Sequence, residues 1–209
     1  NAAIAEHVQE TYGQSCHVIA YGGDHALGAA PVAVPGLELP PDYTLALCRI
    51  EPENNIAMIL EAFSRMPERP LVFVGNWHKS EHGRTLRAQY GDRPNLHLLD
   101  PIYDAAHLRW LRDGAQAYVH GHSAGGTNPS LVEMMHFGIP VFAHGCDFNR
   151  HTTENRAMYF ESAQELISAV ETQDEPQARD NGAAMCDIAR RRYTWGIVGR
   201  AYFELLEHP

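Results

Sequence analysis

The residues best suited to chemistry lie in one stretch, Tyr118 to Ala143, where an apolar run gives way to small polar residues and then to a helical pattern. Asn128 is a good N-cap for that helix, and Pro129 suits its first position, where a missing N–H costs no hydrogen bond. The N–H groups of Ser130 and Leu131, with the Ser130 hydroxyl, would then point out of the helix start. Such a helix start favours phosphate, so the stretch predicts an anion site.

Other residues extend this prediction. Gly125 and Gly126 let a ligand approach the backbone closely, and Thr127 follows them directly. Arg49 follows an apolar run, and its planar guanidinium could neutralise a diphosphate; the alternative is a surface ion pair with a nearby glutamate. Glu133 lies near the end of the first helical turn, where a carboxylate either stabilises the helix or accepts hydrogen bonds from sugar hydroxyls.

The histidines and cysteines give little support for a metal site. His120 and His122 alternate across one glycine, but no third ligand has a convincing position. The four cysteines share no short metal-ligand spacing, and we expect buried free thiols. No metal is therefore predicted.

Short apolar strands alternate with helical patterns, which predicts an α/β fold with a Rossmann-like, doubly wound parallel sheet. Before this sheet we expect a helix over residues 2–13, a short strand from His17 to Tyr21 and a proline-rich linker over 29–42. The expected sheet strands are 43–48, 71–74, 95–99, 117–120, 141–143 and 158–160. The expected helices start at 56, 80, 104, 129, 163, 176 and 195, and residues 145–155 are expected to form a polar loop.

Polar residues follow four of these strands: Arg49, Gly75-Asn76, the run from Asp100 to Tyr103, and the run from His120 to Asn128. Right-handed crossovers place the carboxyl ends of parallel strands at one edge of the sheet, where ligands bind. We therefore expect one site built from four loops.

Composition limits the choice of ligand. The 209 residues contain 16 Lys+Arg against 26 Asp+Glu, and the formal net charge of −10 argues against general nucleic-acid binding. A nucleotide ligand needs only a few local donors and remains compatible with this charge. No apolar run approaches the roughly 20 residues of a membrane span.

Three features together resemble the C-terminal, donor-binding half of the retaining GT-B glycosyltransferases, which include sucrose and glycogen synthases. They are Arg49 with Pro52-Glu53-Asn54-Asn55, the helix start from Asn128 to Glu133, and Gly138-Ile139-Pro140-Val141 after it. The resemblance covers residues 43–209. Residues 1–42 resemble the tail of a missing N-terminal domain and the segment that crosses between domains, so we expect a fragment of a longer protein.

The resemblance implies a nucleotide-diphosphate sugar as substrate, with no cofactor. Arg49 and the helix start would hold the diphosphate, Glu133 the ribose, and the loop with Ile102 and Tyr103 the base. The expected catalytic residues are Arg49 and Glu133, and the expected donor-binding residues are Asn54, Asn76, Ile102, Tyr103, His122, Ser123, Gly125, Gly126, Thr127, Asn128, Pro129, Ser130 and Leu131.

Two departures from the family suggest a narrower match. Gly125 stands where the family has a glutamate that contacts the donor sugar, and Asn54 stands where it has a lysine. The run from His120 to Ser130 resembles bacterial rhamnosyltransferases that build surface polysaccharides from dTDP-L-rhamnose. A 6-deoxy sugar offers one hydroxyl fewer, and His122 or Ser123 could take over the glutamate's contacts.

The expected activity is that of a retaining hexosyltransferase that moves a sugar, such as L-rhamnose, from a dTDP- or UDP-sugar to a glycan or lipid-linked acceptor. The fragment alone is expected to bind the donor without turnover. The resemblance implies a cytoplasmic protein, with peripheral contact at the inner face of the membrane through the missing domain. The alternatives are a non-catalytic nucleotide-sugar-binding module and a sugar-nucleotide epimerase on the same scaffold.

Overall fold

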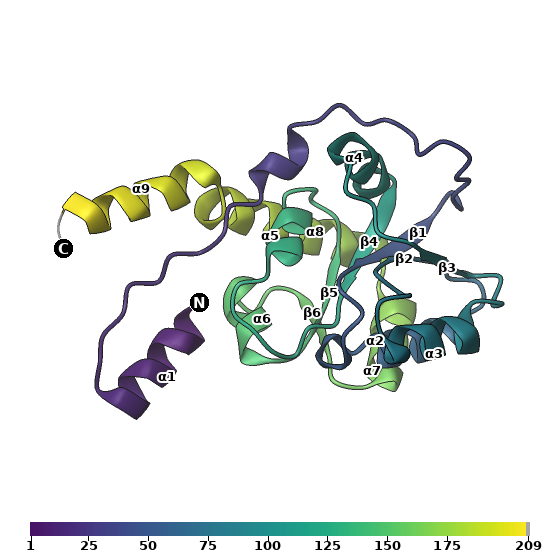
Figure 1. Ribbon diagram of the computed structural model, residues 1–209, viewed down its shortest axis with the longest axis horizontal. Helices are drawn as coiled ribbons and strands as arrows, with labels where there is room; N and C mark the ends of the chain where they lie inside the picture. The colour runs from purple at the N-terminus through teal and green to yellow at the C-terminus, as the bar shows by residue number, and fades with distance from the viewer. Residues whose placement is uncertain (208–209) are drawn as a thin grey trace.

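Residues 1–207 are described by a computed structural model, and within them six strands form one sheet in the order β3-β2-β1-β4-β5-β6 (Figure 1). Every neighbouring pair is parallel, so the predicted α/β, Rossmann-like fold is confirmed. The strands are β1 (Tyr43–Leu47), β2 (Leu71–Val74), β3 (Leu96–Leu99), β4 (Ala115–His120), β5 (Val141–His144) and β6 (Met158–Phe160).

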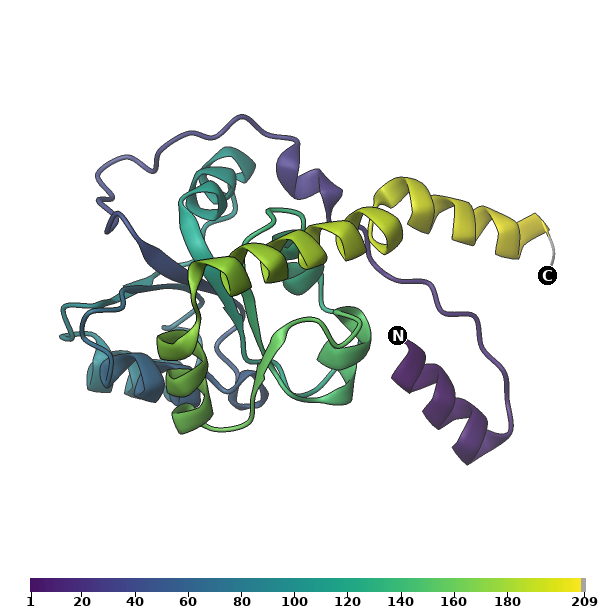
Figure 2. The same ribbon diagram turned by 180° about the vertical axis from the view of Figure 1, so that it is seen from behind.

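Helices cover both faces of the sheet (Figures 1 and 2). The helices α2 (Ile56–Ser64), α3 (Glu81–Tyr90) and α7 (Ala163–Thr172) pack with Ala46, Phe73 and Phe142 in one core cluster. The helices α4 (Ala105–Asp113), α5 (Pro129–Met135) and α8 (Glu175–Arg192) pack with Leu45 and Val72 in the other. Successive strand residues thus face opposite cores, which is why these strands are almost continuously apolar.

Side-chain caps fix where several helices begin. Ser80, Asp104 and Asn128 each accept a hydrogen bond from a backbone N–H in the first turn of α3, α4 and α5, respectively. Pro129 occupies the first helical position of α5, as its sequence predicts. These caps place three helix starts directly after the carboxyl ends of β2, β3 and β4.

The sheet order reverses between β1 and β4. The chain runs outward from β1 to β2 and β3, then returns to add β4 on the other side of β1. The loops after β1 and β4 therefore diverge onto opposite faces of the sheet and leave a crevice, which is the usual ligand position in such sheets.

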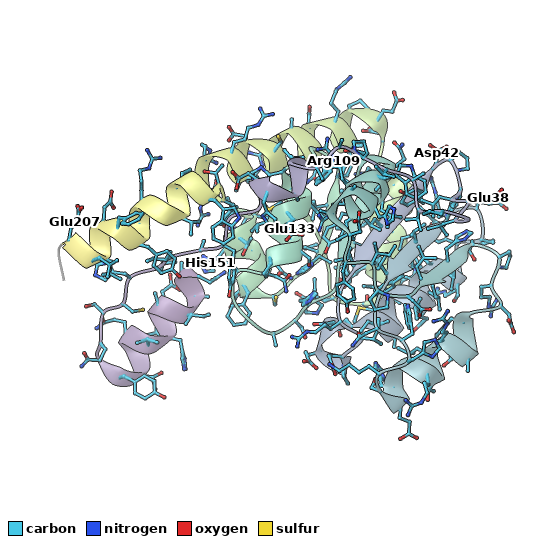
Figure 3. All side chains as sticks on the ribbon, turned by 45° about the horizontal axis from the view of Figure 1, so that its top comes forward. Glu38, Asp42, Arg109, Glu133, His151 and Glu207 are labelled. Atoms are coloured by element: carbon cyan, nitrogen blue, oxygen red, sulfur yellow. The ribbon has the colours of Figure 1, made fainter. Side chains whose placement is uncertain are left out.

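The N-terminal residues lie outside the sheet (Figures 1 and 2). Helix α1 (Ala2–Tyr12) ends at Gly13, as predicted, and packs against α6 (Asp147–Thr152). The Asn1 side chain donates to the Phe148 carbonyl at 3.1 Å, and His151 on α6 lies 4.0 Å from Glu6 (Figure 3). Helix α9 (Trp195–Glu207) extends away from the sheet.

The structure corrects three expectations. Residues His17 to Tyr21 form no strand, because no strand of the described chain lies beside them to pair with. The expected polar loop over 145–155 contains helix α6, whose last turn is closed by hydroxyls that donate to carbonyls four residues back. The four cysteines are free as expected, but Cys16 is exposed and the others are only partly buried.

A short 3-10 turn, η1 (Asp24–Leu27), fastens the segment before the linker to the body of the fold. The Gly23 N–H donates to the Tyr193 carbonyl at 2.7 Å, and Asp24 accepts from the Trp195 N–H at 2.7 Å. Residues 28–42 then run to β1 without strands or helices. Among residues 1–207, no helix has both the length and the apolar character needed to cross a membrane.

Candidate functional site

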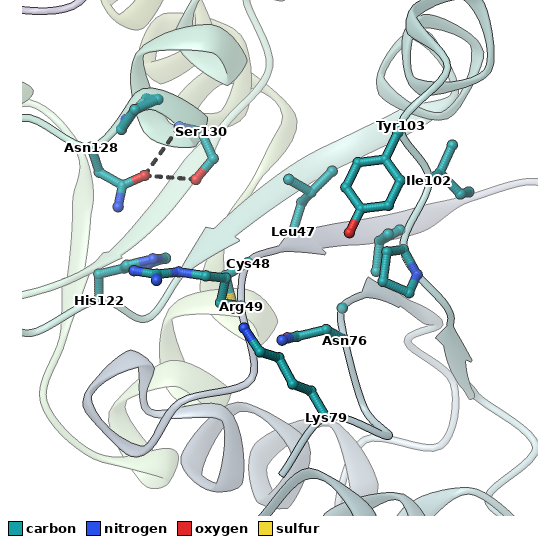
Figure 4. Close-up of a pocket in the computed structure, with 14 residues that line it drawn as sticks. Leu47, Cys48, Arg49, Asn76, Lys79, Ile102, Tyr103, His122, Asn128 and Ser130 are labelled. Atoms are coloured by element: carbon teal, nitrogen blue, oxygen red, sulfur yellow. Dashed lines mark hydrogen bonds between the residues drawn. The ribbon is translucent and has the colours of Figure 1, made fainter.

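Two hollows open at the carboxyl edge of the sheet. The first has a volume of about 510 Å³ and receives residues from the loops after β1, β2, β3 and β4 (Figure 4). Four predicted loops therefore meet there. Its lining consists of Leu47, Cys48, Arg49, Val74, Gly75, Asn76, Lys79, Pro101, Ile102, Tyr103, His122, Asn128, Pro129 and Ser130.

The second hollow has a volume of about 610 Å³ and also has Arg49 in its lining. Glu53, Asn54 and the run from Ala124 to Thr127 line it, together with residues of α1, the segment after it and α9. Arg49, His122, Asn128 and Pro129 line both hollows. The two hollows therefore meet at these four residues, and we call the joined space the cleft.

Hydrogen bonds tie the loop after β1 to the loop after β4. Asn55 Nδ2 donates to the Gly121 carbonyl at 2.8 Å, and both the N–H and the hydroxyl of Ser123 donate to the Glu53 carbonyl at 3.0 and 2.8 Å. A Cβ at Gly121 would lie 2.3 Å from the Asn54 carbonyl oxygen, so only glycine allows this approach. The two walls of the cleft are therefore held at a fixed separation.

Arg49 is oriented by two asparagines. Asn54 is buried and donates from Nδ2 to the Arg49 carbonyl at 2.8 Å. Asn76 accepts a hydrogen bond from the Ile50 N–H at 2.7 Å, across the gap between the loops after β1 and β2. The Arg49 backbone is thereby fixed while its exposed side chain reaches into the cleft (Figure 4).

The start of α5 presents an amide donor to the cleft. Asn128 Oδ1 accepts hydrogen bonds from the Ser130 N–H at 3.0 Å and the Ser130 hydroxyl at 2.8 Å, and that hydroxyl accepts from Tyr118 at 3.1 Å. Because Oδ1 is occupied, the orientation of the amide is set, and Figure 4 shows its nitrogen turned toward His122. The fully buried Leu131 side chain belongs to the core, so only its backbone could face a ligand.

His120 and His122 stack with ring centroids 4.3 Å apart and an angle of 9° between the rings. Burial and, to a smaller extent, the Arg49 charge lower the pKa of His122 to about 4, against an opposing effect of Glu53. Burial, with His122 and His144 nearby, also holds the pKa of His120 well below its usual value. Both rings are therefore neutral near pH 7, and His122 can donate or accept a hydrogen bond in the cleft.

Glu133 lies beside the cleft and lines neither hollow. One carboxylate oxygen of Glu133, which is labelled in Figure 3, forms an ion pair with Arg112 of α4, and the other lies 3.3 Å from His25 Nε2. A carboxylate oxygen can accept more than one hydrogen bond, so the ion pair leaves acceptor capacity for a hydroxyl. The ribose role of Glu133 stays a prediction.

Gly125 has φ +121°, which lies in a region that favours glycine. Open space surrounds it, so a side chain there would meet no neighbouring atom but would strain the backbone. A glutamate at this position would therefore require a different backbone conformation. The backbone N–H and C=O groups of the loop are correspondingly open to a ligand in the second hollow.

The cleft brings most of the predicted residues together but leaves some out. Ser123, Leu131 and Glu133 line neither hollow, and Ser123 instead joins two loops. Sequence patterns missed Glu53, Lys79 and Tyr202, which do line the cleft. Lys79 had one available signal, because it is the sole lysine in the sequence and follows a predicted strand closely. Within residues 1–207, no three His, Cys, Asp or Glu side chains are grouped so that they could hold a metal ion.

Residues 33–172, more than half of the chain, match the protein family described as glycosyl transferases group 1. The chain belongs to this family. A search of curated proteins finds no match.

Solved glycosyltransferase structures share the fold of this family member at low sequence identity. Sucrose-phosphate synthase from Thermosynechococcus elongatus is 20% identical with a TM-score of 0.78, and the match covers 98% of this chain and 57% of that one. HepE from Anabaena, solved with UDP and glucose, is 15% identical with a TM-score of 0.70, and the match covers 81% of this chain and 49% of HepE. The pneumococcal O-GlcNAc transferase GtfA, solved with UDP and GlcNAc, is 14% identical with a TM-score of 0.67, and the match covers 100% of this chain and 44% of GtfA.

The chain, a member of the glycosyl transferases group 1 family, thus spans about half the length of the solved structures it resembles. Its sheet and flanking helices correspond to one Rossmann-like half of their GT-B fold.

Proposed function

We propose that the chain is the donor-binding half of a retaining hexosyltransferase and holds a nucleotide-diphosphate sugar in the cleft. The observation that carries this proposal is the position of Arg49, which lines both hollows at their junction, beside the Asn128 amide. A diphosphate at the junction would place the nucleoside in one hollow and the sugar in the other. Each volume, about 510 and 610 Å³, is sufficient for such a group.

The lining of the hollows supports an orientation for the donor. Ile102 and Tyr103 provide apolar and aromatic surface in the first hollow, which suits a base. Gly125, Gly126 and Thr127 provide backbone groups and a hydroxyl in the second hollow, which suits a sugar. The sugar would therefore lie on the side of α1 and α9, with its anomeric carbon near Arg49.

Transfer would depend on stabilising the departing diphosphate. The acceptor hydroxyl oxygen bonds to the anomeric carbon, the bond from that carbon to the β-phosphate oxygen breaks, and the hydroxyl proton passes to the departing phosphate. Arg49 offers a planar pair of donors to the negative charge that grows on this oxygen. The neutral His122 ring beside it offers a hydrogen bond to either a sugar hydroxyl or a phosphate oxygen.

The sequence from His120 to Ser130 supports L-rhamnose as the sugar and dTDP as the carrier, for a bacterial enzyme of polysaccharide synthesis. The acceptor, a glycan or a lipid-linked sugar, would be bound by a further domain at the inner face of the membrane. Because the chain spans about half of the structures it resembles, we expect it to bind donor without turning it over.

A non-catalytic nucleotide-sugar-binding module is the second candidate, and the absence of the family's glutamate at Gly125 favours it. The full-length protein separates the two candidates. Arg49→Ala should abolish sugar transfer by an enzyme, whereas a binding module has no transfer to lose. An epimerase would instead interconvert free nucleotide sugars without an acceptor.

A thermal-shift panel of dTDP, UDP and GDP, with their sugars, tests donor binding. We expect at least one of the nucleotides to raise the melting temperature of the chain and Arg49→Ala to remove the shift, because ligand binding to the folded state stabilises it. Tighter binding of UDP than of dTDP would exclude the rhamnosyl proposal. No shift with any nucleotide would exclude donor binding altogether.

A further inference from the structure

The first hollow contains a second cation besides Arg49. Lys79 lines this hollow and is the only lysine in the 209-residue sequence. Arg49 follows β1, whereas Lys79 lies in the loop after β2, so the two cations come from neighbouring strands. Figure 4 shows the Lys79 side chain extending into the hollow in the direction of Arg49 and Asn76.

Neither cation has an acidic partner in the part of the chain that the structure describes. The ion pairs found among residues 1–207 involve neither Arg49 nor Lys79. Asp100, which follows β3, is taken by Arg87 at 2.5 Å and by His78 at 3.6 Å. Two unpaired positive charges that line one hollow repel each other unless an anion lies between them.

The backbone that carries Lys79 is firmly held. The Lys79 N–H donates to the Asn76 carbonyl at 3.0 Å, and the Asn76 side chain accepts from the Ile50 N–H at 2.7 Å. Trp77 is fully buried and donates from Nε1 to the Leu99 carbonyl at 2.9 Å. Asn76 therefore joins the two cation-bearing loops directly, and the exposed Lys79 side chain projects from a turn whose backbone is held by hydrogen bonds.

We propose that Lys79 supplies the second positive charge that holds the diphosphate of the donor. This inference rests on the proposed donor binding and assigns a residue that the family pattern does not provide. The loop after β1 contributes Arg49 as its only cation in the first hollow, because the Asn54 amide closes that loop onto the Arg49 carbonyl. The neighbouring loop after β2 contributes the second positive charge.

The two cations have different tasks because their positions differ. Arg49 lines both hollows and contacts the phosphate next to the sugar. Lys79 lines only the first hollow and contacts the phosphate next to the nucleoside. An ammonium group acts as a point charge and tolerates a range of phosphate positions, whereas the guanidinium fork fixes one.

Calorimetric titration of the chain with dTDP, UDP and GDP tests this assignment. For the nucleoside diphosphate that binds most tightly, Lys79→Gln should raise Kd by about 10- to 100-fold, the usual range for a lost hydrogen bond to a charged group. Lys79→Arg should keep most of the affinity because it keeps the charge. Arg179→Gln, an exposed change of the same net charge on α8, is the matched control and should leave Kd unchanged.

The single lysine permits a second measurement on the wild-type chain. An amine-directed acylating reagent modifies Lys79 and the terminal amine, which peptide mass spectrometry separates by position. A bound nucleoside diphosphate should slow acylation of Lys79 several-fold, and the nucleoside without phosphates should not. This readout requires no variant to fold.

The outcomes of these experiments distinguish failure of the Lys79 assignment from failure of the proposed donor binding. If the wild type binds a nucleoside diphosphate and Lys79→Gln binds it equally well, the Lys79 assignment is wrong and donor binding stands. Unchanged acylation of Lys79 in the saturated complex would lead to the same conclusion. If the wild type binds none of the three, both proposals fail.

Discussion

Arg112 and Glu133 form an ion pair between α4 and α5 in which 7% and 15% of the side-chain surfaces, respectively, are exposed. His25 of η1 completes the arrangement from the other side of the carboxylate. Glu133 therefore has a structural role that is independent of any ligand. Its proposed contact with ribose would use acceptor capacity that this arrangement leaves free.

Variants at this ion pair separate the two roles. Glu133→Ala leaves Arg112 buried without a counter-charge, and we expect a loss of about 3 kcal/mol in the free energy of unfolding, measured with urea. The double variant Arg112→Met with Glu133→Leu should recover most of this loss, while nucleotide binding stays weakened because the ribose contact is absent. A Glu133→Ala variant as stable as the wild type would contradict the structural role.

Asn128→Asp tests the amide donor at the start of α5. The carboxylate keeps the acceptor for the Ser130 N–H and hydroxyl, so the cap is retained and the melting temperature should change little. The amide nitrogen becomes a negative oxygen facing the cleft, and we expect affinity for a nucleoside diphosphate to fall about tenfold or more. Asn128→Ala is the comparison, with a loss of about 1 kcal/mol of stability from the missing cap. Undiminished binding by Asn128→Asp would show that this amide does not face the ligand.

The His122 ring predicts a dependence of stability on pH. Its pKa is about 4 in the folded chain against 6.5 as the ordinary value, so between these values the unfolded chain binds more protons. Stability should therefore be fully present above about pH 6.5 and fall as the pH drops toward 4, by at most about 1.4 kcal/mol per pH unit from this group. Urea unfolding of His122→Gln from pH 7 to pH 5 should show a shallower fall than the wild type. Equal slopes would mean that the ring titrates normally in the folded chain.

Gly23 fastens the segment that carries His25. A Cβ at this position would lie 2.6 Å from the Val132 carbonyl oxygen and 2.8 Å from the Glu133 nitrogen, which are backbone atoms that cannot move aside. Gly23→Ala should therefore cost about 1–3 kcal/mol and separate His25 from Glu133. Gly199→Ala, in the open part of α9, is the matched control and should stabilise by up to about 1 kcal/mol. A tolerated Gly23→Ala would show that the segment is not held against α5.

Local patterns predicted the sheet because most strand residues are apolar on both faces and several helices begin at a recognisable cap. β2 and α7 begin and end at the predicted residues, and Asn128 caps α5 as its sequence indicates. The His17–Tyr21 strand was predicted wrongly because an apolar run carries no information about whether a partner strand exists. Helix α6 was missed because its polar residues hide the helical period, and its contacts to α1 lie far away in sequence.

The cleft was predictable only in part. The meeting of four loops follows from the handedness of the crossovers, and these loops do line the first hollow. The pairing of Glu133 with Arg112 could not be predicted, because it depends on how α4 and α5 lie on the same face of the sheet. Lys79 is the sole lysine and closely follows a predicted strand, but this signal does not indicate that its side chain lines the same hollow as Arg49.

The single lysine has a practical consequence for attaching this chain to surfaces. Sensor chips and resins are commonly coupled to proteins through lysine amines, and the only lysine of the sequence, Lys79, lines the first hollow. Coupling at this amine would tether the molecule at its own cleft. A sensor prepared in this way would therefore give no binding signal because access to the cleft is blocked.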